Sequence, residues 1–110
     1  MQVELRIRDT ASRDRLRAYV ERRLRFALSR FGNRVGRVVV RMGRLNGVQG
    51  IDEISCHIEV RLAPSGTLAV KETGTDLFAA IDRAAGRVER LVAHRLERAR
   101  ESKTGRSQCE

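Results

Sequence analysis

The chain has 110 residues, of which 41 % are hydrophobic and 34 % are charged, and its formal net charge is +9 at pH 7. This length predicts a single domain with one core, and the chain contains neither an apolar run long enough to span a membrane nor a leader peptide. An excess of positive charge on a small protein indicates a polyanionic partner.

All but two of the 23 basic residues are arginine, and the lysines are Lys71 and Lys103. The planar guanidinium group suits phosphate recognition, because it donates several hydrogen bonds in a fixed fork. A GC-rich coding bias is an alternative reason for the preference for arginine over lysine. It does not explain why positive residues outnumber negative ones.

The N-terminal third predicts a strand followed by a helix. Val3, Leu5 and Ile7 alternate with charged residues, which is the two-residue period of a half-buried strand. From Ser12, placed as an N-cap, to Gly32, placed just after the C-terminus, apolar residues recur at helical spacing. This apolar stripe consists of Leu16, Val20, Leu24, Ala27, Leu28 and Phe31.

Three strands are expected next. Residues 37–42 are a β-branched run, residues 54–62 alternate strictly between apolar and polar side chains, and residues 67–72 place Leu68 and Val70 inward. A glycine-rich loop at 43–50 and a type I turn through Pro64 and Gly66 connect them. Short connections of this kind predict an antiparallel meander.

The segment from Leu77 to Arg100 predicts a second helix, capped by Thr75 or Asp76. Its apolar residues are Leu77, Ile81, Ala84, Ala85, Val88, Leu91, Val92 and Ala99. We expect Leu77, Ile81, Val88 and Val92 to fasten this helix to the sheet. Residues 102–110 are polar and are expected to form a disordered tail, which puts the folded domain at residues 1–101.

The predicted order is therefore β-α-β-β-β-α. A sheet with one apolar and one polar face must cover the apolar face with the helices. The sequence predicts an α+β fold in two layers, with a four-stranded sheet and both helices on one face.

Basic side chains follow the second helix opposite its apolar stripe. Arg83, Arg87, Arg90, His94 and Arg98 recur at i, i+4, i+7, i+11 and i+15, within a band about 80° wide. Without acidic residues between them, neighbours in such a row repel by a few tenths of a kcal/mol per pair. The first helix likewise carries Arg15, Arg22, Arg23, Arg25 and Arg30 away from its apolar stripe.

If the helices lie side by side, these residues merge into one basic surface. We favour a binding face for nucleic acid or another polyanion over a merely solvated face. Tyr19 and Phe26 lie at the border of the apolar stripe, where packing at the rim is a better interpretation than base stacking.

An enzyme is not expected. His57 and His94 lack the cysteine or carboxylate pattern of a nucleophilic or metal site, and the glycines of 43–50 lack the spacing of a phosphate-binding loop. Cys56 alternates with core residues and is predicted to be a small buried hydrophobe, and Cys109 has no activating neighbour. We expect no cofactor, metal or small-molecule substrate.

Three short segments resemble the family of ribosome hibernation-promoting factors, also called protein Y or ribosome-associated inhibitor and formerly sigma-54 modulation proteins. The most specific is GTDLFAAID at 74–82, which is similar to the family signature G-x-D-[ML]-[YF]-A-A-I-D. LRAYVERRL at 16–24 and GTLAVKETG at 66–74 resemble its first helix and last strand. The likeness extends over about residues 3–100.

The resemblance implies a fold like a double-stranded-RNA-binding domain, and binding to the small ribosomal subunit in the channel for mRNA and tRNA. It also implies inhibition of translation in idle or stressed cells. Arg23, Arg87 and Arg90 stand at positions where the family has basic residues, and His94 replaces another. Three features differ from the family: Phe26 stands where lysine is common, residues 84–86 are smaller than usual, and the loop GRLNGVQGID at 43–52 is longer than in short members.

Together these arguments predict a set of rRNA-binding residues: Arg22, Arg23, Arg25, Arg30, Arg83, Arg87, Arg90, His94 and Arg98. The expected partners are the small ribosomal subunit and its rRNA, with a cytoplasmic location, no membrane partner and a monomeric free state. Because the chain ends at Glu110, it resembles the short members of the family, which lack a ribosome-pairing domain. An RNA-binding regulatory module with a non-ribosomal partner is the alternative.

Overall fold

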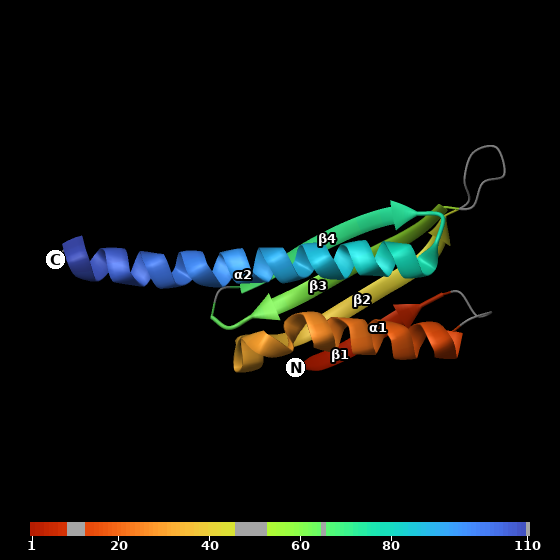
Figure 1. Ribbon diagram of the computed structural model, residues 1–110, viewed down its shortest axis with the longest axis horizontal. Helices are drawn as coiled ribbons and strands as arrows, with labels where there is room; N and C mark the ends of the chain where they lie inside the picture. The colour runs from red at the N-terminus through yellow and green to blue at the C-terminus, as the bar shows by residue number, and fades with distance from the viewer. Residues whose placement is uncertain (9–12, 46–52, 65, 110) are drawn as a thin grey trace.

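The computed structural model describes residues 1–8, 13–45, 53–64 and 66–109 (Figure 1). The elements in chain order are β1 (Gln2–Ile7), α1 (Arg13–Leu28), the 3-10 helix η1 (Ser29–Arg34), β2 (Val35–Leu45), β3 (Glu53–Leu62), β4 (Gly66–Gly74) and α2 (Leu77–Cys109). The predicted order of strands and helices is confirmed. The turn η1 is an addition, and within it Gly32 has a φ of 56° and a ψ of −132°, a conformation that glycine adopts most readily.

The four strands form one mixed sheet in the order β1-β2-β3-β4. Strands β2, β3 and β4 pair antiparallel, as the meander predicts, whereas β1 pairs parallel to β2. The crossover through α1 makes a parallel pair possible, since parallel strands cannot be joined by a tight turn. Both helices lie on one face of the sheet, side by side (Figure 1), which confirms the two-layer α+β fold.

The core is the layer between this sheet face and the helices. Alternate residues of β3, from Ile54 to Leu62, are buried, as are Val38 and Val40 of β2. Within the described residues no polar or charged residue is buried. The predicted stripe of α1 is buried at Leu16, Val20, Leu24, Ala27 and Leu28, whereas Phe31 is only partly buried.

Helix α2 begins at a side-chain cap, because Asp76 Oδ1 accepts hydrogen bonds from the backbone N–H groups of Phe78 (2.9 Å) and Ala79 (3.4 Å). Its buried residues are Ala80, Ile81, Ala84, Ala85, Val88 and Val92. Of the four residues expected to fasten α2 to the sheet, Ile81, Val88 and Val92 are buried and Leu77 is partly buried. Leu91, an apolar residue outside that set, is 41 % exposed. Helical spacing places it at the margin of the buried stripe, one turn after Arg87, which contacts β4.

Two connections differ from the sequence-based expectations. The strand β2 continues to Leu45, so the first residues of the loop predicted at 43–50 are strand, and residues 46–50 lie outside the described residues. The peptide bond between Ala63 and Pro64 is cis. The expected type I turn includes Ser65, which also lies outside the described residues.

The last residues form helix rather than the disordered tail predicted for 102–110, because α2 runs as far as Cys109. Extending an existing helix fixes one residue for each new hydrogen bond, so a polar segment without proline can continue it. The C-terminal part of α2 projects beyond the sheet (Figure 1), and the molecule measures 60 × 27 × 17 Å. A domain boundary at residue 101 stays a prediction.

Ile81 and Leu91 of α2 differ in burial, so substitution of each by alanine tests which of them belongs to the core. Ile81→Ala should lower the free energy of unfolding by about 2–5 kcal/mol, because it removes fully buried methyl groups and leaves a cavity. Leu91→Ala should change it by less than about 1 kcal/mol, because this side chain is already partly in water. Urea unfolding measures both; equal losses would place Leu91 in the core.

Candidate nucleic-acid interface

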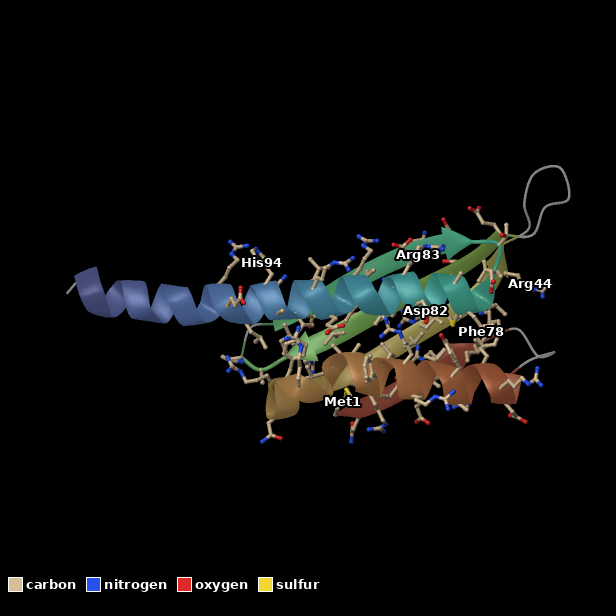
Figure 2. All side chains as sticks on the ribbon, in the orientation of Figure 1. Met1, Arg44, Phe78, Asp82, Arg83 and His94 are labelled. Carbon is tan, nitrogen blue, oxygen red and sulfur yellow. The ribbon has the colours of Figure 1, made fainter. Side chains whose placement is uncertain are left out.

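The basic row predicted on α2 lies at the surface. Arg83, Arg87, Arg90, His94 and Arg98 are all exposed. Figure 2 shows Arg83 and His94 projecting from α2 on the side away from α1, whereas Asp82 lies between the two helices. The helical spacing therefore places these five side chains on the outer side of α2, opposite the buried stripe.

The first two arginines of this row are tied to the edge strand β4. Arg83 donates a hydrogen bond from Nη2 to the backbone oxygen of Thr73 (2.9 Å), and Arg87 donates from Nη1 to that of Lys71 (3.0 Å). Glu72 pairs with both, at 3.0 Å from Arg87 Nη1 and 3.8 Å from Arg83 Nε. Glu72 therefore offsets part of the positive charge and holds both guanidinium groups on the β4 side of α2.

The rest of the row has no such counter-charge. Arg90, His94 and Arg98 make no ion pair with any residue that the structure describes. Arg22 and Arg25 of α1 are likewise exposed and have no ion pair within the described chain. The most available cations are thus in the middle and C-terminal part of α2 and on the outer side of α1.

A polar seam joins the two helices at Asp82. Asp82 Oδ1 accepts a hydrogen bond from the Tyr19 hydroxyl (2.6 Å) and pairs with Arg23 Nε at 3.4 Å. The Tyr19 ring also meets Phe78 edge to face, with 4.9 Å between ring centroids. Acceptance of this hydrogen bond by Asp82 raises the pKa of Tyr19 above its ordinary value.

Arg23 is consequently less available than the sequence suggested. Its side chain is only 26 % exposed, and its Nη1 atom is buried without a hydrogen-bond partner. Its contact with Asp82 directs it toward α2. Arg23 therefore contributes to the relative position of the helices, and the sequence-based set of binding residues did not anticipate this.

A second cross-helix link lies at Arg30. Its Nη2 atom is 3.5 Å from Glu89 Oε2 of α2, and its guanidinium group lies over the Phe31 ring at 4.5 Å from the centroid. With the seam at Asp82, which joins α1 to α2, this link from η1 gives a second contact to α2. The expectation that the outer sides of both helices merge into one basic surface stays a prediction.

The interpretation of Phe26 as a rim-packing residue is wrong, because 81 % of it is exposed. Tyr19 lies seven residues earlier, about 10 Å along the helix, where Phe78 covers it. Arg22 lies one turn earlier on α1, whereas Arg30 lies on η1 and pairs with Glu89. An exposed aromatic ring beside an exposed arginine is suited to stacking on a nucleobase whose neighbouring phosphate the arginine binds.

The sequence did not predict that acidic residues hold several of the arginines in place. The helical spacing did place Asp82 outside the basic row, on the opposite flank, and that flank faces α1. Nothing in the helix pattern relates Glu72 to α2, because it lies on another element. Only the packing of α2 along β4 brings Glu72 to Arg83 and Arg87.

Other kinds of site have little support in the described residues. Cys56 is buried, as predicted, and burial together with the negative charge of Glu72 raises its pKa to about 12, so the thiol stays protonated. In the described part of the chain no three His, Cys, Asp or Glu side chains gather as metal ligands. Neither described helix has an apolar stretch long enough to cross a membrane.

Comparisons with known proteins agree with this description. Residues 3–100 match the family described as sigma 54 modulation protein / S30EA ribosomal protein. The crystal structure of the N-terminal domain of protein Y from Thermus thermophilus is 30 % identical, with a TM-score of 0.63, and the match covers 84 % of this chain and 96 % of that one. No curated protein sequence matches the chain.

A ribosomal subunit interface protein from Coxiella burnetii is also similar in structure. Its TM-score is 0.66, and the match covers 86 % of this chain and 96 % of that one. At 13 % identity this likeness shows the fold alone.

The Asp82 seam predicts a pH-dependent stability. Tyr19→Phe should lower the free energy of unfolding by about 0.5–1.5 kcal/mol at neutral pH, because it removes the hydrogen bond to Asp82. Folding raises the pKa of Tyr19, so the folded state binds the phenolic proton more tightly than the unfolded state. The contribution is therefore complete below the ordinary value of 10.0 and is lost as the pH rises through the raised pKa.

Urea unfolding at several pH values measures this difference. The gap between wild type and Tyr19→Phe should be constant near neutral pH and should narrow in alkaline solution. A gap that widens with pH, or that is absent throughout, would contradict the seam.

Proposed function

The chain belongs to the sigma 54 modulation protein / S30EA ribosomal protein family, and on this basis we propose that it is a ribosome hibernation factor. It binds the small ribosomal subunit in the channel that mRNA and tRNAs use, and inhibits translation in idle or stressed cells by occupying that channel. The action is steric and needs no catalytic group. Its place is the cytoplasm, and it is a monomer until it binds.

The observation that supports this proposal is the exposure of basic residues on the outer sides of both α1 and α2. Arg22 and Arg25 contribute from α1, and Arg90, His94 and Arg98 contribute from α2, all exposed. Each arginine can donate two parallel hydrogen bonds to a phosphate. Binding to rRNA relieves the repulsion between neighbouring cations of α2 and releases counterions from the RNA.

The arginines that already pair with acidic residues contribute to rRNA binding in a different way. Arg83 and Arg87 keep exposed guanidinium nitrogens beyond those bound to β4, so they can contact phosphate without leaving Glu72. Arg23 acts mainly by positioning α1 against α2 through Asp82. In this scheme the first part of the α2 row is preorganised and the later part is free to adapt to the rRNA.

Phe26 adds a contact that does not depend on charge. Its ring stacks on an unpaired base of the rRNA, next to a phosphate bound by Arg22. A purely duplex-binding surface does not need such a ring, since the bases of A-form RNA are stacked within the helix. The exposed ring therefore favours the folded rRNA of a ribosomal subunit, with its loops and bulges, over plain duplex RNA.

Sedimentation with small ribosomal subunits tests the function directly. The protein should pellet with subunits at low salt and leave them as salt rises, with the logarithm of the affinity falling by about 0.7–0.9 per phosphate contact for each unit of log salt. Free duplex RNA should compete poorly. Failure to pellet even at low salt would exclude the proposal, and equal competition by duplex RNA would favour the alternative of a general RNA-binding module.

Reversal of one uncompensated cation tests the surface. Arg90→Glu should weaken binding to small subunits at least about tenfold and reduce the salt dependence by about one contact. Arg90→Lys keeps the charge and should retain most of that salt dependence while losing the bidentate geometry. Circular dichroism and urea unfolding should be unchanged for both. Wild-type affinity of Arg90→Glu at every salt concentration would exclude this part of α2 from the interface.

Substitution of the exposed ring tests base stacking. Phe26→Ala should weaken binding by about 1–3 kcal/mol, whereas Phe26→Tyr should bind like the wild type because it keeps an aromatic face. The free energy of unfolding should change by no more than about 0.5 kcal/mol in either variant, since the ring is in solvent. A loss of stability without a loss of affinity would instead indicate a packing role.

A further inference from the structure

The open face of the sheet, which the helices do not cover, carries a second group of cations. Arg6, Arg41, His57 and Lys71 occupy one transverse row, because Arg6 pairs in register with Arg41, Arg41 with His57 and His57 with Lys71. Arg6, Arg41 and Lys71 are exposed and His57 is partly exposed. One basic residue from each of the four strands thus lies side by side across the full width of the sheet.

One pair in this row is unfavourable for the isolated protein. Arg6 and Arg41 lie directly opposite each other on neighbouring strands about 4.8 Å apart, where like charges destabilise a sheet. The nearest acids are in the next row, where Glu4 and Glu59 flank Val39. Glu4 is engaged by Arg37 at 2.6 Å and by Arg6 at 3.4 Å, and the Arg37 hydrogen bond lowers its pKa. Arg41 and Lys71 form no ion pair within the described chain.

A hollow beside this row has no acidic residue in its lining among the described residues. Its lining includes Arg6, Arg8, Arg41, Ser55 and His57, whereas Arg44, which also borders it, pairs in register with the buried Ile54 of the helix-covered face. Gly43 pairs with Ser55 in the middle of it, and the absence of a side chain at Gly43 leaves the space open. A Cβ atom there would lie 3.8 Å from Arg8 Cδ. The neighbouring hollow on the same face also contains arginines, but Glu4 and Glu59 line it as well.

We propose that the hollow at Gly43 is a phosphate-binding site, and that through it the open face of the sheet contacts a second segment of RNA. The guanidinium groups of Arg6, Arg8 and Arg41, around a small space that no described acidic residue lines, match a phosphate group in charge and hydrogen-bond geometry. The helix surface lies on the opposite side of a molecule only 17 Å thick. The domain is therefore held between two RNA segments, one on the helices and one on the sheet.

The phosphate site stands on its own geometry, whereas its occupation by RNA rests on the proposed function. The experiment therefore has two arms. In the first, amide NMR spectra of the whole chain are recorded during titration with inorganic phosphate, with chloride used to hold the ionic strength constant. In the second, the same variants are sedimented with small ribosomal subunits over a range of salt.

The test variant is Arg41→Gln with His57→Gln, and the matched control is Arg61→Gln, which removes an exposed arginine from the neighbouring hollow of the same face. In the wild type and the control, the amides of Gly43 and Ser55 should shift saturably with phosphate. In the test variant that saturable shift should be lost. The test variant should also bind subunits about tenfold more weakly, with a salt dependence lower by about one contact, while the control keeps its affinity.

Any other result of the NMR and sedimentation experiments contradicts part of the proposal. Without a saturable shift in the wild type, or with an equal loss in the control, the phosphate site is refuted. A saturable shift together with unchanged subunit binding by the test variant refutes the RNA contact and leaves free phosphate as the ligand. If the wild type itself does not bind subunits, the proposed function fails, and the NMR arm still decides the phosphate site. A shift of the same amides by a polyglutamate peptide at lower concentrations than by an oligouridylate refutes RNA as the occupant.

Discussion

Both helices bury their apolar stripes against the same face of one four-stranded sheet, and no charged residue is buried among those that the structure describes. A chain with 23 basic residues must then distribute them over two surfaces, the outer sides of the helices and the open face of the sheet. Positive charge is therefore dense on both surfaces, because the core lies on only one face of the sheet. The arginines cannot be buried in the core instead, because an unpaired buried charge costs several kcal/mol or more.

Acidic residues set the geometry of the helix surface. Asp82 links α2 to Tyr19 and Arg23 of α1, and Glu72 holds the first arginines of the α2 row against β4. These contacts are partly exposed, so each stabilises the fold only modestly. They also connect the elements that carry the basic residues: the Asp82 contacts join α1 to α2, and Arg90, His94 and Arg98 are exposed on α2.

Much of the fold was predictable because periodicity reports burial directly. The alternation in residues 54–62 and the helical stripe from Leu16 to Leu28 both match the buried residues. The parallel pairing of β1, the exposure of Leu91 and the partners of Arg83 and Arg87 depend on which element lies alongside which, and one helix pattern does not contain that information. The exposure of Phe26 could not be predicted for the same reason, since a residue at the border of an apolar stripe is buried only where a neighbouring element covers it.

The most direct test of the central claim is a chemical footprint of the bound protein on the rRNA of the small subunit. A factor that occupies the path of mRNA and tRNA through its basic helix surface should protect nucleotides of the decoding region. Protection should weaken in the Arg90→Glu variant at the same sites. Protection confined to other parts of the subunit, or none at all under conditions where the protein pellets with subunits, would contradict the account.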